Sequence, residues 1–153
     1  MAPASAYNRV MSDSCLLRSE TNPTSTTRGS VGGLLVEALA SRDFERMAEC
    51  FEPTATMRAL LPRGPATFEG ASEITAAFSL WFGSAPGFEV LGATVGDVGT
   101  RLHLAWRLRV DRTPRGDVGW HVIEQQAYAQ AGERIEALDL LCTGFMSDPE
   151  PAR

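Results

Sequence analysis

Hydrophobic residues follow a helical spacing in the first half of the folded part of the chain. Between residues 30 and 51 this spacing predicts two helices, the second capped by Asp43 and ended by Pro53. Residues 70–82 repeat the pattern and predict a third helix. The segments 54–61 and 67–69 are β-compatible and extended, and a Pro-Arg-Gly-Pro turn separates them.

From residue 88 onwards the pattern changes to the alternation that is typical of strands. It predicts strands over 88–98, 101–111, 120–130 and 135–145, with the last two joined by a tight turn at 130–133. Over 101–111 the alternation is clean, with an apolar face of Leu102, Leu104, Trp106, Leu108 and Val110. The polar face carries Arg101, His103, Arg107, Arg109 and Asp111. Helices followed by antiparallel strands predict an α+β fold, with the helices on one face of a curved sheet.

The hairpin over 120–145 is the candidate functional element. We assign its inner face to Trp120, Val122, Glu124, Gln126 and Tyr128, and after the turn to Leu138, Leu140 and Cys142. His103 and His121 are then both expected on the outer face. This predicts an apolar cleft with a single acid, Glu124, suited to general acid or base chemistry. The alternative is a buried Glu124, paired to an Arg or Tyr, that only maintains the shape of the pocket.

Composition limits the class of protein. The chain has 153 residues, 44% hydrophobic and 22% charged, which favours one globular domain. Its net charge of −5 and the lack of a basic block argue against a nucleic-acid surface. No apolar run is long enough to span a membrane and the N-terminus lacks a signal-peptide pattern, so we expect a cytoplasmic protein. The widely spaced Cys15, Cys50 and Cys142 indicate reduced thiols and no metal site.

Both ends of the chain have the composition of tails. Residues 1–29 are rich in Ser, Thr, Pro and Ala, which predicts a mostly disordered segment. Residues 148–153 contain two prolines and predict a short C-terminal tail. The folded domain is therefore expected over 30–147.

Three stretches, in this order, resemble the nuclear transport factor 2-like superfamily: ALASRDFERMAECFEPTATM, FEGASEITAAF and VIEQQAYAQAGERIEALDLL. That superfamily includes ketosteroid isomerases and SnoaL-like polyketide cyclases, and the resemblance covers roughly residues 30–146. It implies a cone-shaped curved antiparallel sheet wrapped around three N-terminal helices, with an internal pocket. It also implies a homodimer, for which the polar outer face of the sheet is the expected interface.

The resemblance allows a test of candidate active-site positions. The general-base position of ketosteroid isomerases falls on Ala59, their oxyanion-hole tyrosine on Leu35, and their second oxyanion acid on Glu124. Two of these three are apolar, so the usual proton shuttle of the isomerases is not expected. A resemblance to limonene epoxide hydrolases rests on Arg109-x-Asp111, but the late aspartate position is Leu140, one residue beyond Asp139.

We therefore expect a cofactor-independent cyclase, isomerase or dehydratase that acts on a hydrophobic polyketide- or terpenoid-like metabolite. Glu124 and Tyr128 are the expected catalytic residues. The expected substrate-binding residues are Trp106, Trp120, Val122, Gln126, Leu138, Leu140, Cys142, Phe78, Trp81, Met57, Leu35 and Ala59. The alternatives are a non-catalytic module that binds a hydrophobic ligand or forms a dimeric adaptor, and an epoxide hydrolase of the limonene type.

Overall fold

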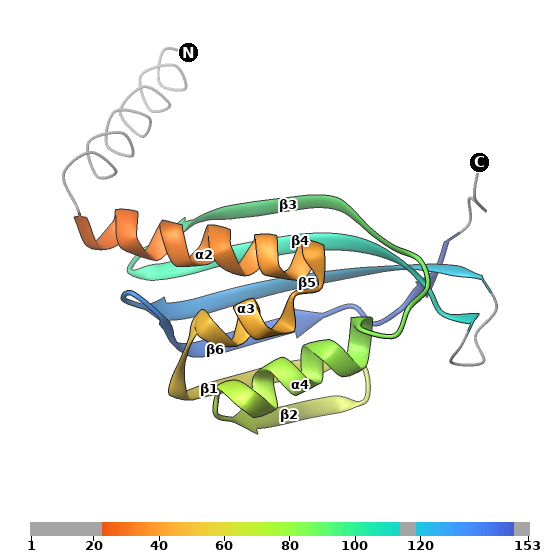
Figure 1. Cartoon of the computed structure of the whole chain (residues 1–153), viewed down its shortest axis with the longest axis horizontal. Helices are drawn as coiled ribbons and strands as arrows, with labels where there is room; N and C mark the ends of the chain where they lie inside the picture. Colours follow the sequence, from red (N-terminus) through yellow and green to blue (C-terminus); the bar gives the residue numbers. More distant parts are fainter. Residues whose placement is uncertain (1–22, 114–118, 149–153) are drawn as a thin grey trace, which may run out of the picture.

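The computed structural model describes residues 23–113 and 119–148, which form three helices and one sheet (Figure 1). The helices are α2 (Pro23–Ser41), α3 (Phe44–Glu49) and α4 (Ala71–Phe82). The strands are β1 (Phe51–Leu61), β2 (Gly64–Glu69), β3 (Phe88–Val98), β4 (Arg101–Asp111), β5 (Trp120–Ala131), β6 (Ile135–Cys142) and β7 (Met146–Ser147). The predicted α+β class is confirmed, with all three helices on one face of a curved, unclosed sheet.

The sheet has seven strands in the order β2-β1-β6-β5-β4-β3, and β7 pairs with β5. Its pairs are antiparallel except for β1 and β6, which run parallel, so the expectation of a wholly antiparallel sheet was wrong at this one place. The two strands are separated by residues 62–134, so no hairpin fixes their relative direction. This parallel pair joins the β1–β2 hairpin to the long meander from β3 to β6.

The helices divide the inner face of the sheet between them. Helix α2 packs on β3 and β4, α4 packs on β1 and β2, and α3 contacts both helices. Helix α2 lies very close to the sheet at Gly32, where an added Cβ would be 2.9 Å from Cγ1 of Val95. Glycine therefore allows α2 to bury its apolar face directly against the strands.

The core lies between the helices and the inner face of the sheet. On β4 the alternation predicted from the sequence is confirmed, because Leu102, Leu104, Trp106, Leu108 and Val110 are all buried. The ring of Trp106 packs 6.2 Å from that of Phe78 on α4, measured between centroids. The helix spacing of α4 likewise places Ile74, Ala77 and Phe78 in this core.

The α2–α3 junction fixes the C-terminal end of α4. The Asp43 side chain accepts a hydrogen bond from the backbone N–H of Arg46 at 3.1 Å, which confirms the predicted cap of α3. Arg42 has a positive φ of 52°, and its guanidinium donates to the carbonyl oxygens of Phe82 (3.2 Å) and Ala85 (2.6 Å). These bonds satisfy carbonyls where α4 ends and position the wall that α4 contributes to the site below.

The structure moves both predicted domain boundaries. Helix α2 begins at Pro23, so residues 23–29 are helical rather than part of a disordered tail, while residues 1–22 lie outside the described residues. Asp148 accepts a hydrogen bond from Nε of Arg109 at 2.6 Å and so belongs to the fold, and residues 149–153 lie outside the described part. The remaining extent of the domain stays a prediction.

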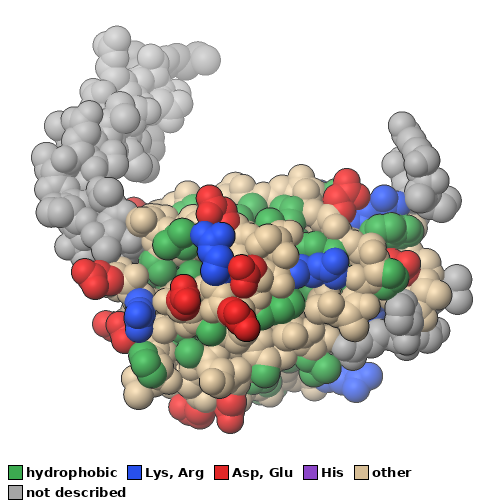
Figure 2. All heavy atoms as spheres, in the orientation of Figure 1, with side chains coloured by type: hydrophobic (Ala, Val, Ile, Leu, Met, Phe, Trp, Pro, Cys, Tyr) green, Lys and Arg blue, Asp and Glu red, His purple; other side chains and the backbone are tan. Residues whose placement is uncertain are grey.

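The surface on the helix side mixes charges of both signs. Figure 2 shows Asp and Glu side chains interspersed with Arg on this face, with hydrophobic side chains in small separate groups. Among the described helices, none is long and apolar enough to cross a membrane.

Candidate ligand-binding site

Strand β5 faces the opposite way from the prediction. Its register with β4 sets Ala127 opposite Leu104 and Gln125 opposite Trp106. Directly opposed residues of an antiparallel pair share a face, so Gln125 and Ala127 point toward the helices. The predicted inner residues Trp120, Val122, Glu124, Gln126 and Tyr128 therefore lie on the outer face, and their assignment to the internal pocket was wrong.

The physical reason is the space beneath the helices. Ala127 and Ala129 are fully buried, so the inner face of β5 takes small side chains in the packed core. A tyrosine at either position would overfill this layer. The alanines at 127, 129 and 131, alternating with larger residues, were the signal in the sequence that identifies this face.

Glu124 is consequently not a lone acid in an apolar cleft. Its Oε1 accepts from Nη2 and Nε of Arg107 at 2.9 and 3.1 Å, and the two side chains are 45% and 56% exposed. The Tyr128 ring stacks on His103 with centroids 4.9 Å apart. His103 lies on the outer face as predicted, whereas His121 is buried on the inner face, contrary to the prediction.

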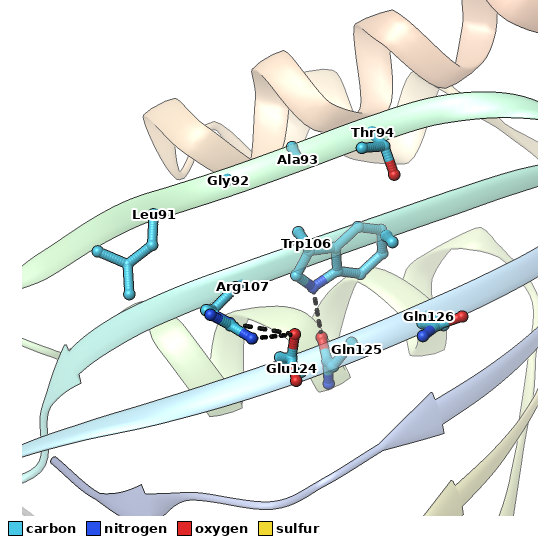
Figure 3. Close-up of a pocket in the computed structure, with 10 residues that line it drawn as sticks. Leu91, Gly92, Ala93, Thr94, Trp106, Arg107, Glu124, Gln125 and Gln126 are labelled. Atoms are coloured by element: carbon cyan, nitrogen blue, oxygen red, sulfur yellow. Dashed lines mark hydrogen bonds and ion pairs between the residues drawn. The ribbon is translucent and has the colours of Figure 1, made fainter.

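Glu124 and Gln126 instead line a shallow groove on the outer face (Figure 3). The groove holds about 410 Å³ and runs across β3, β4 and β5, with Leu91 and Thr94 on β3. Trp106 and Gln125 contribute to its floor, and Nε1 of Trp106 donates to Oε1 of Gln125 at 2.8 Å. Small residues on β3 and β4 create this hollow, which is open to solvent.

A second cavity, which we call the end cavity, lies on the inner side of the sheet at one end. It holds about 510 Å³ and lies between the end of α4, the β1–β2 turn and the segment that follows β6. Its apolar lining consists of Leu61, Pro62, Leu80, Trp81, Ile123 and Phe145, and its polar lining of Arg63, Arg112, Cys142, Thr143 and Gly144. Trp81 and Cys142 were predicted as binding residues. The predicted residues Leu35, Met57, Ala59, Phe78, Trp106, Leu138 and Leu140 are buried on the inner side but do not line this cavity.

Aromatic contacts fix the walls of the end cavity. The Trp81 ring meets Phe78 edge-on, with centroids 5.3 Å apart, and Phe145 meets Phe82 at 6.2 Å. The guanidinium of Arg112 lies 3.9 Å above the centre of the Phe145 ring. Such interlocked rings give the cavity rigid, flat walls.

A buried polar chain positions the Cys142 thiol at the cavity. Gln125, which is 1% exposed, accepts from Trp106 through Oε1 and donates through Nε2 to Sγ of Cys142 at 3.4 Å. The backbone N–H of Gly144 donates to the same sulfur at 3.4 Å. Each polar atom of the Gln125 amide is thus engaged, so the glutamine acts as a support for Trp106 and Cys142.

Gly144 holds the segment after β6 against the β1–β2 turn. Its φ is +77°, and an added Cβ would lie 2.5 Å from Cγ of Pro62. Both features require glycine. This contact forms one side of the end cavity.

The charged lining of the end cavity is cationic. Arg63 and Arg112 line it, and no carboxylate or histidine does so among the residues that the structure describes. Sequence reasoning missed both arginines and Phe145, because they lie in turns and strand-end segments that carry no periodic pattern. No group of three or more His, Cys, Asp or Glu residues suited to a metal ion occurs in residues 23–113 and 119–148.

The positions compared with known enzyme families hold no acid inside the fold. Leu35 and Ala59 are buried, and neither side chain carries an acidic or basic group. Arg109 lies on the outer face, where it pairs with Asp148 at 2.6 Å and Glu89 at 3.7 Å. On that face two hydrogen bonds from Thr113 lower the pKa of Asp111. The Arg-x-Asp pair therefore does not reach the interior, and the arrangement expected of an epoxide hydrolase does not form.

Comparison with solved structures identifies the fold. The structure of Bal32a from a soil-derived mobile gene cassette is 16% identical with a TM-score of 0.65, over 79% of this chain and 92% of that one. A proposed SnoaL-like polyketide cyclase from Shewanella putrefaciens is 9% identical with a TM-score of 0.59, over 75% and 88% of the two chains. A protein with a ketosteroid isomerase-like fold from Catenulispora acidiphila, in complex with trimethylamine, is 13% identical with a TM-score of 0.58, over 72% and 82%. No protein-family model and no curated protein matches the sequence.

Proposed function

Because the chain has the nuclear transport factor 2-like fold, shared with SnoaL-like and ketosteroid isomerase-like proteins, we propose that it is a cofactor-independent cyclase or isomerase. Its substrate is a hydrophobic, polyketide- or terpenoid-like molecule that binds in the end cavity. The observation that supports this most is the set of rigid aromatic walls around the end cavity.

This composition favours catalysis by orientation. A cavity with fixed, flat walls holds a flexible chain in the folded conformation from which a ring closes, which lowers the entropic part of the barrier. Glu124 lies on the other face of the sheet and takes no part in this proposal. The fold by itself does not fix the chemistry, so the proposal depends on the cavity.

Blocking the cavity chemically tests the proposal. In a Cys15→Ser background, N-benzylmaleimide should label Cys142, which is partly exposed, before Cys50, which is buried and whose thiol pKa is raised by that burial. The added benzyl group should fill the cavity and abolish ring formation from a synthetic poly-β-ketone, followed by absorbance and mass spectrometry. A Cys142→Ser variant should keep its activity after the same treatment. Full activity of the labelled protein would exclude the end cavity as the active site.

Glu124→Gln separates this proposal from the catalytic role predicted for Glu124. It removes a charge from a solvent-exposed pair with Arg107, so turnover should change by less than about twofold. Loss of turnover with unchanged ligand binding would show that the active site lies at Glu124 and the outer groove rather than in the end cavity.

A non-catalytic binding module is the second candidate. The lack of a recognisable general base among the described lining residues favours it. A ring-containing ligand that binds the parent protein and is displaced by labelling of Cys142, without turnover of any poly-β-ketone tested, would support this candidate.

We also propose that the outer face of the sheet forms a homodimer. Leu60 and Leu141, which are 55% and 48% exposed, lie in one cross-strand row with Gln126, Ala105 and Thr94. The Arg58–Asp139 pair lies along one side of this row and the Arg107–Glu124 pair along the other. A row with two exposed leucines between charge pairs can match itself under a two-fold axis, so the proposed partner is a second copy of this chain.

A further inference from the structure

One row of residues on the outer face of the sheet changes from protruding side chains to a hollow. At one end of the row Leu60 and Leu141 protrude into solvent, 55% and 48% exposed. The row continues through Gln126 to Ala105 and Thr94. These last three residues line the shallow groove of the outer face, which Figure 3 shows with Gln126 and Thr94.

The protruding and hollow positions are equally spaced about Gln126 on β5. Leu141 on β6 and Ala105 on β4 each lie one strand away from it, on opposite sides. Leu60 on β1 and Thr94 on β3 each lie two strands away. Neighbouring strands are about 4.8 Å apart, so each protruding leucine has a position in the hollow at a matching distance from Gln126. Such spacing allows a two-fold axis to match the surface with itself.

The direction of the axis determines which residues meet. An axis along β5, through Gln126, sets Leu141 of one copy over Ala105 of the second copy. The same axis sets Leu60 over Thr94. An axis along the row, at right angles to the strands, would set Leu141 over Leu141 and leave the two hollows facing each other. Protein interfaces are close-packed, so the axis along β5 is favoured, and it also aligns the strands of the two sheets, which is a common arrangement of packed sheets.

The groove is large enough for the protruding side chains. It holds about 410 Å³, whereas shortening one buried leucine to alanine leaves a space on the order of 150 Å³. Gly92 helps to keep the groove open, because a Cβ added there would meet no atom within 4 Å. Two leucine side chains from a second copy therefore fit into it.

The charged residues beside the row are compatible with the axis along β5. Asp139 of one copy would lie over His103 of the second copy, because each lies one strand from Tyr128 in the next row. On the other side of the row Glu124 falls on the axis, and its ion-pair partner Arg107 comes with it. Two acids and two arginines then meet with no net charge, which avoids repulsion between like charges.

We infer that the groove of the outer face receives Leu60 and Leu141 of a second copy, with the two-fold axis along β5 at Gln126. This inference rests on the proposed homodimer and adds how its two copies fit together. The two Gln126 side chains meet at the axis, where each amide can donate a hydrogen bond to the other and accept one from it.

Exchanging a protruding and a hollow position tests this fit. Ala105→Phe fills the groove and should raise the Kd of the dimer at least about tenfold, as measured by sedimentation velocity. Adding Leu141→Ala to the same chain makes room for the phenylalanine of the second copy and should restore the Kd to within about threefold of the parent. Leu34→Ala is the matched control for this second change, because Leu34 is similarly exposed (44%) but lies on helix α2.

The control combination of Ala105→Phe with Leu34→Ala should dimerise as weakly as Ala105→Phe alone. If Leu141→Ala gives no better recovery than this control, the inferred fit is overturned. A parent protein that is monomeric would overturn the inference together with the proposed homodimer.

Chemical cross-linking tests the fit with smaller changes to the surface. In a background of Cys15→Ser and Cys142→Ser, dibromobimane joins two thiols that lie close together. Leu141→Cys and Ala105→Cys in the same chain should give covalent dimers, seen by gel electrophoresis and mass spectrometry. Leu141→Cys alone should give no more than the background protein. Covalent dimers of Leu141→Cys alone would place the axis along the row, and a dimeric protein that neither variant cross-links would exclude the inferred fit; both results leave the homodimer itself intact.

Discussion

Asp139 on the outer face accepts hydrogen bonds from two arginines that come from different strands. Nε of Arg58 on β1 donates to it at 2.7 Å and Nη2 of Arg101 on β4 donates at 2.8 Å. The hydrogen bond from Arg58 is the main reason that the pKa of Asp139 lies below its ordinary value; partial burial opposes this effect, and Arg101 adds to it. The parallel pairing of β1 with β6 brings Asp139 beside Arg58.

This lowered pKa makes a small part of the stability depend on pH. A carboxyl group whose pKa is lower in the folded state stabilises the fold above its unfolded pKa of about 4, and the effect is lost as pH falls through the folded pKa. At neutral pH, Asp139→Asn should lower the free energy of unfolding by less than about 1 kcal/mol, because solvent screens the cluster. The difference from the parent should vanish in strong acid.

Urea unfolding over a series of pH values measures this difference. Glu136→Gln is the control, because Glu136 is an exposed residue of the same strand that pairs with neither Arg58 nor Arg101. If the free energies of unfolding of Asp139→Asn and the parent differ by the same amount at every pH, the lowered pKa of Asp139 does not contribute to stability.

The sequence correctly predicted which face of a strand is buried only where all the large apolar side chains lie on one face. Strand β4 has large apolar side chains on one face and charges on the other, so its inner face was predicted correctly. Strand β5 carries apolar residues on both faces, and its orientation depends on the register with β4. That register follows a connection whose geometry the sequence does not reveal, so Glu124 was placed on the wrong face.

At the scale of elements, the connections that border the end cavity matter as much as the strands. Gly144 combines a φ of +77° with close contact to Pro62. Gly144→Ala should lower the free energy of unfolding by about 1–3 kcal/mol, because it adds backbone strain and a steric clash. It should also weaken ring binding in the end cavity, since the segment after β6 must move.

Thermal unfolding measures the first effect, and titration with a ring-containing ligand measures the second. Gly96→Ala is the matched control, because an added Cβ at this position on β3 meets no atom within 4 Å and the residue has no positive φ. Its stability should change much less, and ligand affinity should stay as in the parent. Equal stabilities of the two variants would show that the Gly144–Pro62 contact is not tight in solution.

The elements themselves were largely predictable, whereas the site was not. The three helices, the long strands and the hairpin follow from periodicity, and Asp43 marked the start of α3. The end cavity instead depends on Pro62, Arg63, Arg112 and Phe145, which meet only after distant turns are brought together. No local sequence pattern predicts that these residues come together.

At the scale of the whole molecule, the homodimer proposed for the outer face of the sheet leads to one testable prediction about assembly. If Leu141 lies at a two-fold interface, Leu141→Glu places two like charges near each other and should convert the dimer to a monomer. Leu34→Glu is the control, because Leu34 is similarly exposed (44%) but lies on helix α2, on the opposite side of the sheet. Sedimentation velocity should show a dimer for the parent and the control.

A monomeric parent at the highest concentration that can be tested would exclude the proposed dimer. A dimer that survives Leu141→Glu would place the interface elsewhere on the molecule. Neither result affects the end cavity, which lies on the inner side of the sheet.

The two edges of the sheet have a consequence for how the protein avoids fibre formation. Edge strand β2 contains Pro65, which has no N–H to offer an incoming strand, and edge strand β3 has an irregular register between Val90 and Gly92. An exposed edge with regular hydrogen-bonding groups would accept a strand from another molecule and seed cross-β aggregates. These two interruptions make such strand addition unfavourable. Molecules can therefore associate through the face of the sheet without adding strands at its edges.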